Sequence, residues 1–450
     1  RGEGLGLPLA EAMLFDLPVI TTAWGGQTDF CDATTAWCCD FDFAKAETHM
    51  GMTHSLWAEP RRAHLSALMK DLVQLDDAEK KHRTSKARER VLAQLSWKQT
   101  ATRVKQAVDA LKSEKLMRKE PKIAWISTWN ARCGIANYSH FLTQHIPASR
   151  LRVLANHIPE RMAIDQNYVL RCWNAEQDER FEYALETILE EGIAAVVIQY
   201  NFGFCSTENL AAFLQQLQTH HIQAHVFFHS TADVKHIDDF KSLGTIRASL
   251  AQAARLYVHG VDDVNRLKDW GLVDNVVYFP HGIAPMLAHQ STKPPHSQSK
   301  TVIASYGFLL PHKGIRELIE AFALLRYGND DYHLLLVNAL YPASVSTETE
   351  RICRQRIEEL GLQAHVTLIT DYLSDHETKQ HLSNADLIVY AYQGTQESSS
   401  AAVRVGLSVG CPVLVTPLAI FSDVEEAVHY LPGTSSEMIA AGIRHVMKQE

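Results

Sequence analysis

The feature that most constrains the fold is an alternation of short apolar runs with helical patterns, which starts afresh twice. The run "KIAWIST" (Lys122–Thr128) precedes a glycine-containing loop and a helical pattern, and "KTVIASYG" (Lys300–Gly307) does the same. This alternation is typical of parallel α/β sheets. It predicts two α/β domains, at residues 121–288 and 300–450. A polar segment with two prolines, at residues 289–300, is expected to link them.

Further elements follow from the same patterns. A charged block is expected to form helices at Pro60–Leu75 and Asp77–Lys115, and a helix is expected at Ile315–Arg326. Other buried strands are expected at Ala194–Tyr200, Ala224–His229, Ala254–His259, Asn275–Pro280, Tyr332–Ala339, His365–Thr370 and Ala385–Tyr392.

Composition narrows the class of protein. Of the 450 residues, 46% are hydrophobic and 21% are charged, which is the balance of a globular protein. The formal net charge of −9 argues against bulk nucleic-acid binding, because a protein needs positive charge to neutralise phosphates. None of the eight cysteines forms a C-x-x-C pair, and no secretion signal is visible, so a cytoplasmic protein without a metal is expected.

The first residues of the chain, "EGLGLPLAE", combine two carboxylates with glycines. Seven residues separate Glu3 from Glu11, and Gly4 and Gly6 lie between them. Pro8 suits the first helical turn, so a helix is expected from about residue 7, with Glu11 on its first turn. Free N–H groups beside flexible glycines favour an anion such as a diphosphate, and flanking carboxylates suit sugar hydroxyls. An ordinary capped helix with acidic residues near its positive end remains the alternative.

The stretch has an echo near the other end of the chain. An offset of 394 positions carries Glu3 onto Glu397, and "LPVITT" (Leu17–Thr22) onto "CPVLVT" (Cys411–Thr416). A repeat this distant indicates two copies of a large module. Residues 1–118 are then expected to be the C-terminal, donor-binding part of a first module, whose front half lies upstream of residue 1.

The spacing of the two carboxylates, the glycines and the following strand resemble the E-x7-E signature of retaining family-4 glycosyltransferases, the glycosyl transferases group 1. The resemblance implies the GT-B fold, in which two Rossmann-like domains face each other across a cleft. It also implies that Glu3 contacts a donor sugar and Glu11 a nucleotide ribose, with Gly4 and Gly6 beside them.

Residues 121–450 resemble the same family over nearly the full length of a module. Gly134 in "CGIANYS" is similar to the glycine loop after the first strand, and His229 in "FFHSTADV" to an active-site histidine near the sugar. "GFLLPHKGI" resembles the loop that clamps the diphosphate, with Gly307 and Lys313 in place. Phe308 stands where the family has an arginine. For His229 a structural role and for Lys313 an ordinary surface position are the alternatives.

The second copy of the signature, "ESSSAAVRV", keeps only its first carboxylate. By resemblance Glu397 would hold the donor sugar, whereas Val405 replaces the ribose-binding glutamate. Arg404 lies one residue out of register. The hydroxyl and N–H groups of the serines could still meet a phosphate, so the expected donor-binding residues also include Ser398, Ser399, Ser400 and Arg404.

The resemblance implies transfer of a hexose from a nucleotide-diphosphate sugar, with His229, Lys313 and Glu397 as catalytic residues and no cofactor or metal. Tandem enzymes of this kind are often bacterial and build O-antigen or related surface polysaccharide, with GDP-mannose a common donor. The acceptor would be a glycan or lipid-linked saccharide, at the inner face of the cytoplasmic membrane. The rival interpretation is a degenerate, non-catalytic module that binds glycan or nucleotide. A phosphorylase-type or epimerising GT-B enzyme is a third.

Overall fold

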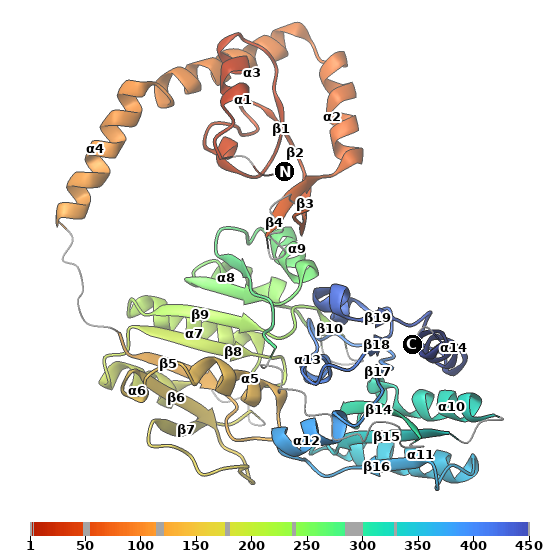
Figure 1. Cartoon of the computed structure of the whole chain (residues 1–450). Helices are drawn as coiled ribbons and strands as arrows, with labels where there is room; N and C mark the ends of the chain where they lie inside the picture. The colour runs from red at the N-terminus through yellow and green to blue at the C-terminus, as the bar shows by residue number, and fades with distance from the viewer. Residues whose placement is uncertain are drawn as a thin grey trace. The chain divides into compact units, whose positions relative to one another are not determined.

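The computed structural model describes residues 2, 4–47, 55–113, 121–175, 181–235, 240–283, 300–327 and 331–448. Contacts divide the chain into two compact units, 1–120 and 121–450, which are described separately (Figure 1). The expected linker at 289–300 lies outside the described residues, apart from Lys300. Among the described helices, none is both long and apolar enough to cross a membrane.

The first unit contains a short parallel strand pair, an antiparallel hairpin and four helices among its described residues. A small core forms where α1 packs on α3, around Met13, Phe30 and Val91. In chain order the elements are α1 (Leu7–Leu14), β1 (Ile20–Thr22), η1 (Gly26–Asp29), β2 (Trp37–Cys39), β3 (Phe41–Lys45), β4 (Leu56–Pro60), α2 (Arg62–Gln74), α3 (Asp77–Gln94) and α4 (Trp97–Ser113).

The long helix expected at Asp77–Lys115 is wrong, because the chain forms α3 and α4 with a break between them. Leu95 ends α3, and the hydroxyl of Ser96 accepts a hydrogen bond from the backbone N–H of Gln99 at 3.4 Å. A serine in this position caps a new helix start, so it interrupts an otherwise continuous charged pattern.

The second unit begins with a seven-stranded parallel sheet in the order β13-β12-β9-β8-β5-β6-β7. Its strands are β5 (Ile123–Ser127), β6 (Leu151–Asn156), β7 (Val169–Trp173), β8 (Ala195–Tyr200), β9 (Gln223–Phe228), β12 (Arg255–Val258) and β13 (Val276–Tyr278). The helices of this sheet and a small separate hairpin are α5 (Gly134–Thr143), η2 (Ala148–Arg150), α6 (Glu182–Glu190), α7 (Thr207–Thr219), β10 (Val234–Lys235), β11 (Phe240–Lys241), η3 (Leu243–Ile246), α8 (Arg247–Leu250) and α9 (Val261–Asp269).

Two of these strands, β6 and β7, were not expected from the sequence, because arginines interrupt their apolar runs. Arg171 in β7 sits in a largely buried place where its guanidinium binds Asp165 and donates to the carbonyl oxygens of Asn156 and Trp129. A buried charge is tolerated when it is paired and fully hydrogen-bonded, so the strand forms despite the charge.

A second parallel sheet, of six strands, has the order β16-β15-β14-β17-β18-β19. Taken in chain order this is 3-2-1-4-5-6, the arrangement of a doubly wound Rossmann-like domain. Its elements are β14 (Thr301–Phe308), η4 (Pro311–Lys313), α10 (Ile315–Arg326), β15 (Tyr332–Ala339), α11 (Ser344–Glu359), β16 (Val366–Ile369), α12 (Asp375–Leu382), β17 (Leu387–Tyr390), α13 (Ala401–Leu407), β18 (Val413–Val415), η5 (Ala419–Ala427), β19 (His429–Tyr430) and α14 (Ser436–Met447). The expected α/β class with two Rossmann-like domains is therefore confirmed.

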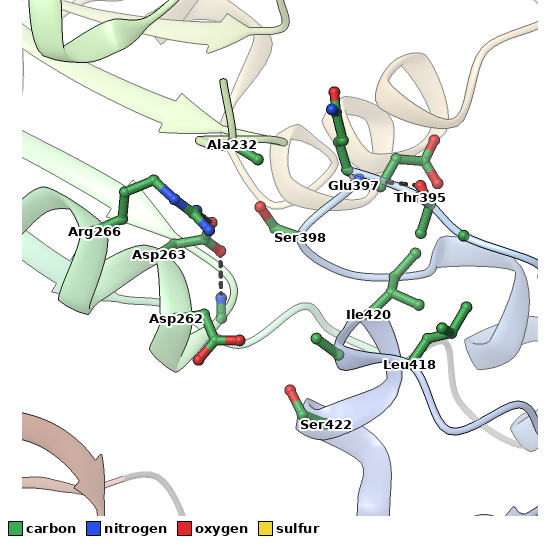
Figure 2. Close-up of a pocket in the computed structure, with 14 residues that line it drawn as sticks. Ala232, Asp262, Asp263, Arg266, Thr395, Glu397, Ser398, Leu418, Ile420 and Ser422 are labelled. Carbon is green, nitrogen blue, oxygen red and sulfur yellow. Dashed lines mark hydrogen bonds and ion pairs between the residues drawn. The ribbon is translucent and has the colours of Figure 1, made fainter. Parts of the chain in front are cut away.

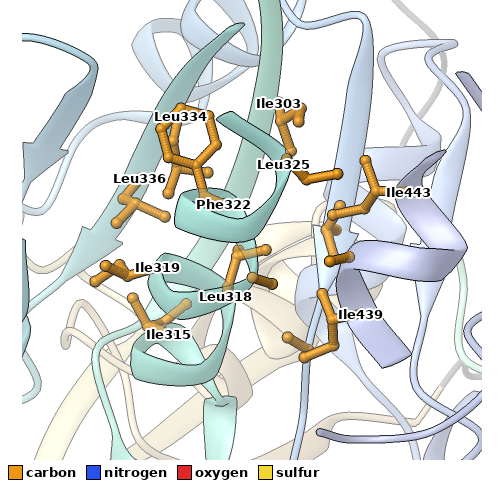
Figure 3. Close-up of a cluster of buried hydrophobic side chains, with 14 of the residues drawn as sticks. Ile303, Ile315, Leu318, Ile319, Phe322, Leu325, Leu334, Leu336, Ile439 and Ile443 are labelled. Atoms are coloured by element: carbon orange, nitrogen blue, oxygen red, sulfur yellow. The ribbon is translucent and has the colours of Figure 1, made fainter. Parts of the chain in front are cut away.

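The core of this second sheet forms where α10 and α14 cover one of its faces (Figure 3). Burial of each large apolar side chain contributes on the order of 1.5–3 kcal/mol. The fully or nearly fully buried residues shown there include Ile303, Ile315, Leu318, Ile319, Phe322, Leu325, Leu334, Leu336, Ile439 and Ile443.

The two repeated segments fold alike. Helix α1 begins at Leu7 and α13 begins at Ala401, 394 positions later. Each helix is followed by a strand that pairs in parallel with the next strand of its own unit, β1 with β2 and β18 with β19. The helix start expected near residue 7 is confirmed, but Glu11 is its fifth residue and lies beyond the first turn.

Candidate active site

The candidate site lies at the topological switch point of the six-stranded sheet, between β14 and β17. In open α/β sheets ligands bind outside the carboxyl ends of the strands at this point. The loop after β14 leads into η4, and the loop after β17 runs to α13. A backbone hydrogen bond of 2.8 Å from Gln393 to His312 ties the two loops together.

Lys313, the last residue of η4, meets Glu397 at this point. Its Nζ lies 3.1 Å from a carboxylate oxygen of Glu397 and 4.1 Å from the ring centre of Tyr392. The lysine side chain is 11% exposed, whereas that of Glu397 is 50% exposed. The pair therefore joins a buried cation to a carboxylate that reaches solvent.

Electrostatics keeps Lys313 charged. Burial opposes the charge, but Tyr392 and the Glu397 carboxylate outweigh it, and the pKa of Lys313 is raised above its usual value. A buried ammonium held charged beside a half-exposed carboxylate is an arrangement suited to an anionic ligand group.

His229 comes from the other sheet, directly after β9. Its Nε2 lies 2.8 Å from the side-chain oxygen of Gln199. Its carbonyl oxygen accepts a 3.2 Å hydrogen bond from the backbone N–H of Ser398, the residue after Glu397. Burial, with His259 and His281 nearby, holds the pKa of His229 well below its usual value, so the imidazole is neutral. His229 thus lies against the loop that carries Glu397.

The two expected glycines lie where backbones approach closely. Gly134 begins α5, and a Cβ placed on it would lie 4.0 Å from the Cβ of Ala401, at the start of α13. Gly307, with φ +137°, is the next-to-last residue of β14 and lies beside Ala402. Both glycines therefore lie against the first turn of α13.

The three expected serines have different surroundings. Ser399 donates to Asp423 at 2.7 Å, and the hydroxyl of Ser400 caps α13 by accepting from the N–H of Val403 at 3.3 Å. The hydroxyl of Ser398 is buried and has no hydrogen-bond partner among the described residues. Ser398 is therefore the serine of this set whose hydroxyl remains available to a ligand.

Arg404 is buried beside these serines and all three of its nitrogens are engaged. Nε donates to the carbonyl oxygen of His281 at 3.0 Å, Nη1 donates to that of Ser400 at 2.8 Å, and Nη2 pairs with Asp423. This network links the segment after β13 to α13, and it engages each nitrogen of Arg404 with a group of the protein.

The first-unit residues are placed in part. Glu3 lies outside the described residues. Gly6 has φ +83° at the start of α1, which favours glycine, and the carbonyl of Gly4 packs against Gly26. Glu11 is exposed on α1.

The sequence did not single out several groups that complete the site. Tyr392 lies beneath Lys313, and Asp423 holds both Ser399 and Arg404. The ring of Tyr138 lies 4.8–5.4 Å, centre to centre, from three histidine rings, those of His229, His259 and His281. Tyr392 has a recognisable signal, because it is the last residue of the strand expected at Ala385–Tyr392, whose carboxyl end lies at the site.

Comparison with known protein families matches the C-terminal part of the chain. Residues 288–450 match the family described as Glycosyl transferases group 1. No curated protein matches the sequence.

Solved structures resemble the chain in fold at low identity. Sucrose-phosphate synthase from Thermosynechococcus elongatus is 16% identical, with a TM-score of 0.58 over 73% of this chain and 90% of that chain. Anabaena Alr3699/HepE in complex with UDP is 13% identical, with a TM-score of 0.55 over 73% and 90%. An alpha,alpha-trehalose-phosphate synthase (UDP-forming) from Burkholderia vietnamiensis is 8% identical, with a TM-score of 0.56 over 74% and 91%.

At these identities the likeness establishes the fold, which is GT-B. The family match and the fold together support a glycosyltransferase.

Proposed function

We propose that this chain transfers a hexose from a nucleotide-diphosphate sugar to a hydroxyl group of a glycan, with retention at the anomeric carbon. The observation that carries the proposal is the buried Lys313 ammonium, 3.1 Å from Glu397 at the switch point of the sheet. Glu397 would bind hydroxyls of the donor sugar, and Lys313 would neutralise charge on the leaving diphosphate.

His229 would contact the same sugar from the opposite domain. Because burial keeps its imidazole neutral, it would act by hydrogen bonding rather than as a cation. Gly134 and Gly307 would supply backbone contacts to the donor. Arg404 would contribute by holding the start of α13 in place.

The wider assignment is also a proposal. It places the enzyme in bacterial surface polysaccharide or O-antigen synthesis, with mannose a candidate hexose and a lipid-linked saccharide a candidate acceptor at the membrane surface. Residues 1–118 would belong to a first module in which Glu3, Gly4, Gly6 and Glu11 bind donor. Structures of Anabaena Alr3699/HepE contain UDP and UDP-glucose, which makes uridine nucleotides the first donors to test.

A non-catalytic nucleotide- or glycan-binding module is the second candidate. Two observations favour it. Phe308, at the position of an expected cation, packs its ring on Tyr341 and Tyr372 instead. Val405, at the position of an expected carboxylate, packs against the apolar core.

Donor turnover distinguishes the two candidates. We expect the full chain to bind UDP or GDP in calorimetry and to hydrolyse or transfer sugar from UDP-glucose or GDP-mannose. Lys313→Met should lower turnover about 100-fold, because loss of one group that stabilises developing charge costs roughly this much. Glu397→Gln should also lower turnover, because it removes the carboxylate that would bind the sugar hydroxyls and that pairs with Lys313. Lys448→Met is the matched control, because Lys448 is exposed and belongs to neither loop of the site.

Unchanged turnover in both Lys313→Met and Glu397→Gln would overturn the enzyme assignment for this site. Nucleotide binding without turnover of either donor would support the non-catalytic module.

A further inference from the structure

A cavity of about 300 Å³ opens next to the loop that carries Glu397 (Figure 2). One wall comes from the first sheet's domain, at the start of α9, and the other comes from the loop after β17 and the start of η5. Its size is at the lower end of the range for small-ligand sites. The lining residues from α9 and its approach are Ala232, Gly260, Asp262, Asp263 and Arg266.

Hydrogen bonds hold the side chains of the α9 wall. The carboxylate of Asp263 accepts from the N–H of Gly260 at 3.1 Å and also binds the hydroxyl of Thr231. Arg266 donates through Nη1 to Thr231 and, at 3.1 Å, to Asp263. Arg266 lines the cavity, and its Nε and Nη2 make no hydrogen bond to the described residues.

The cavity also offers groups that suit hydroxyls. Asp262 is exposed and presents an acceptor-only carboxylate, and the buried Ser398 hydroxyl has no partner among the described residues. Figure 2 shows Ser398 directed toward the side of the cavity that Arg266 and Asp263 form. A carboxylate, a guanidinium and a hydroxyl around one small space are donors and acceptors that match a polyol.

Charge selects the class of polyol. The charged residues that line the cavity are Asp262, Asp263, Glu397 and Arg266. Arg266 is paired with Asp263 and Lys313 is paired with Glu397, so among the described residues Asp262 is the carboxylate of this set that has no cationic partner. A phosphorylated sugar would bring its negative charge to a surface that is acidic on balance, and this costs free energy. A neutral saccharide meets no such repulsion.

We propose that this cavity is the acceptor subsite and that it binds the neutral end of a saccharide through Asp262, Arg266 and Ser398. The inference rests on the proposed function. Because the loop that lines the cavity also carries Glu397, an acceptor hydroxyl there lies beside the donor sugar. Its oxygen bonds to the anomeric carbon as the bond from that carbon to the diphosphate oxygen breaks. The leaving diphosphate takes the bonding electron pair and then the hydroxyl proton.

Ligand-detected NMR on the full chain tests the subsite, with UDP present at saturation. The probes are methyl α-D-mannoside and methyl β-D-glucoside as neutral saccharides, and glucose 6-phosphate as the charged alternative. We expect saturation transfer to at least one neutral glycoside and none to the phosphate. Asp262→Asn should weaken the glycoside signal at least about 5-fold. Asp269→Asn, at the other end of α9, should leave it unchanged.

Ala232→Phe serves as the second variant, because it fills the cavity without altering a charge. It should also abolish the glycoside signal while UDP binding and thermal unfolding stay as in the parent. A glycoside signal that survives both variants, or stronger binding of glucose 6-phosphate, would overturn the subsite. If the parent did not bind UDP, that result would count against the proposed function. The cavity would then be tested by the glycoside signal of the parent and the two variants measured without UDP.

Discussion

Burial keeps three histidines near the site in their neutral form. The rings of His229, His259 and His281 surround Tyr138 at the meeting of the two sheets. Burial is the main cause that lowers the pKa of each of the three, and it takes that of His281 to about 3. Within the described residues, no group of three histidine, cysteine or acidic side chains is placed to hold a metal ion.

These histidines predict how stability depends on pH. In the unfolded chain each binds a proton below about pH 6.5, whereas in the folded protein each stays neutral to a lower pH, which for His281 is about 3. For His281 the unfolded state therefore binds more protons between about pH 6.5 and 3, and stability falls as pH falls through this window. The lowered pKa values of His229 and His259 act in the same direction. Each histidine contributes a slope of at most about 1.4 kcal/mol per pH unit.

Chemical unfolding at pH 7, 6, 5 and 4 measures this slope. His281→Gln should flatten it by up to about 1.4 kcal/mol per unit, while His157→Gln, at an exposed histidine, should not. An identical slope in His281→Gln and in the parent would contradict the neutral buried cluster.

At the same scale, the sequence placed some site residues and could not place others. Lys313 and Glu397 were predicted because their local motifs are specific, and the structure brings them together. Their roles in donor binding stay predictions. Tyr392, Asp423 and Tyr138 act through neighbours distant in the chain, and no local pattern encodes such a contact. Arg404 shows the same limit, since its engagement with Asp423 and His281 follows from packing alone.

Among the elements, the turn from η4 into α10 sets the position of Lys313. Gly314 has φ +68°, and a Cβ placed on it would lie 1.8 Å from the carbonyl oxygen of Ala391 in the loop after β17. This close approach keeps the two loops of the site together, so the lysine on one loop reaches the carboxylate on the other.

Gly314→Ala is therefore expected to lower the free energy of unfolding by about 3 kcal/mol, since it adds a left-handed alanine and a backbone collision. Gly361→Ala is the matched control. Gly361 also has a positive φ, +63°, but no atom lies within 4 Å of its Cβ position. This control should cost about 1 kcal/mol. Equal losses in urea unfolding of the two variants would show that the approach to Ala391 does not constrain the turn.

Element prediction succeeded where one physical signal dominated. The apolar period of Ile315–Arg326 predicted α10 to the residue, because one face of the helix is buried against the sheet. It failed at β6 and β7, where arginines paired with acidic residues break the apolar run. It also failed between α3 and α4, where one serine ends a long charged pattern. In both cases hydrogen bonds of a polar side chain, and not the apolar or charged character of the segment, decided the secondary structure.

The whole molecule consists of two units that each have their own core. The pattern of contacts divides the chain into residues 1–120 and residues 121–450. The two doubly wound sheets and the Lys313–Glu397 pair lie in the second unit. A ligand that binds only the folded form of one unit stabilises that unit by mass action. Nucleotide binding should therefore raise the temperature of one unfolding transition and leave that of the other unchanged.

Differential scanning calorimetry of the full chain should resolve two transitions, and a chain of residues 121–450 alone should reproduce one of them. A nucleotide at 100 times its Kd should stabilise that transition by about 2.7 kcal/mol and leave the other in place. UDP and GDP are the probes, with ATP as the matched control for non-specific binding. If both transitions moved together, the units would unfold as one body. If UDP and GDP moved neither transition, a nucleotide site at Lys313 would be excluded, because its occupancy must raise the stability of the unit that contains it.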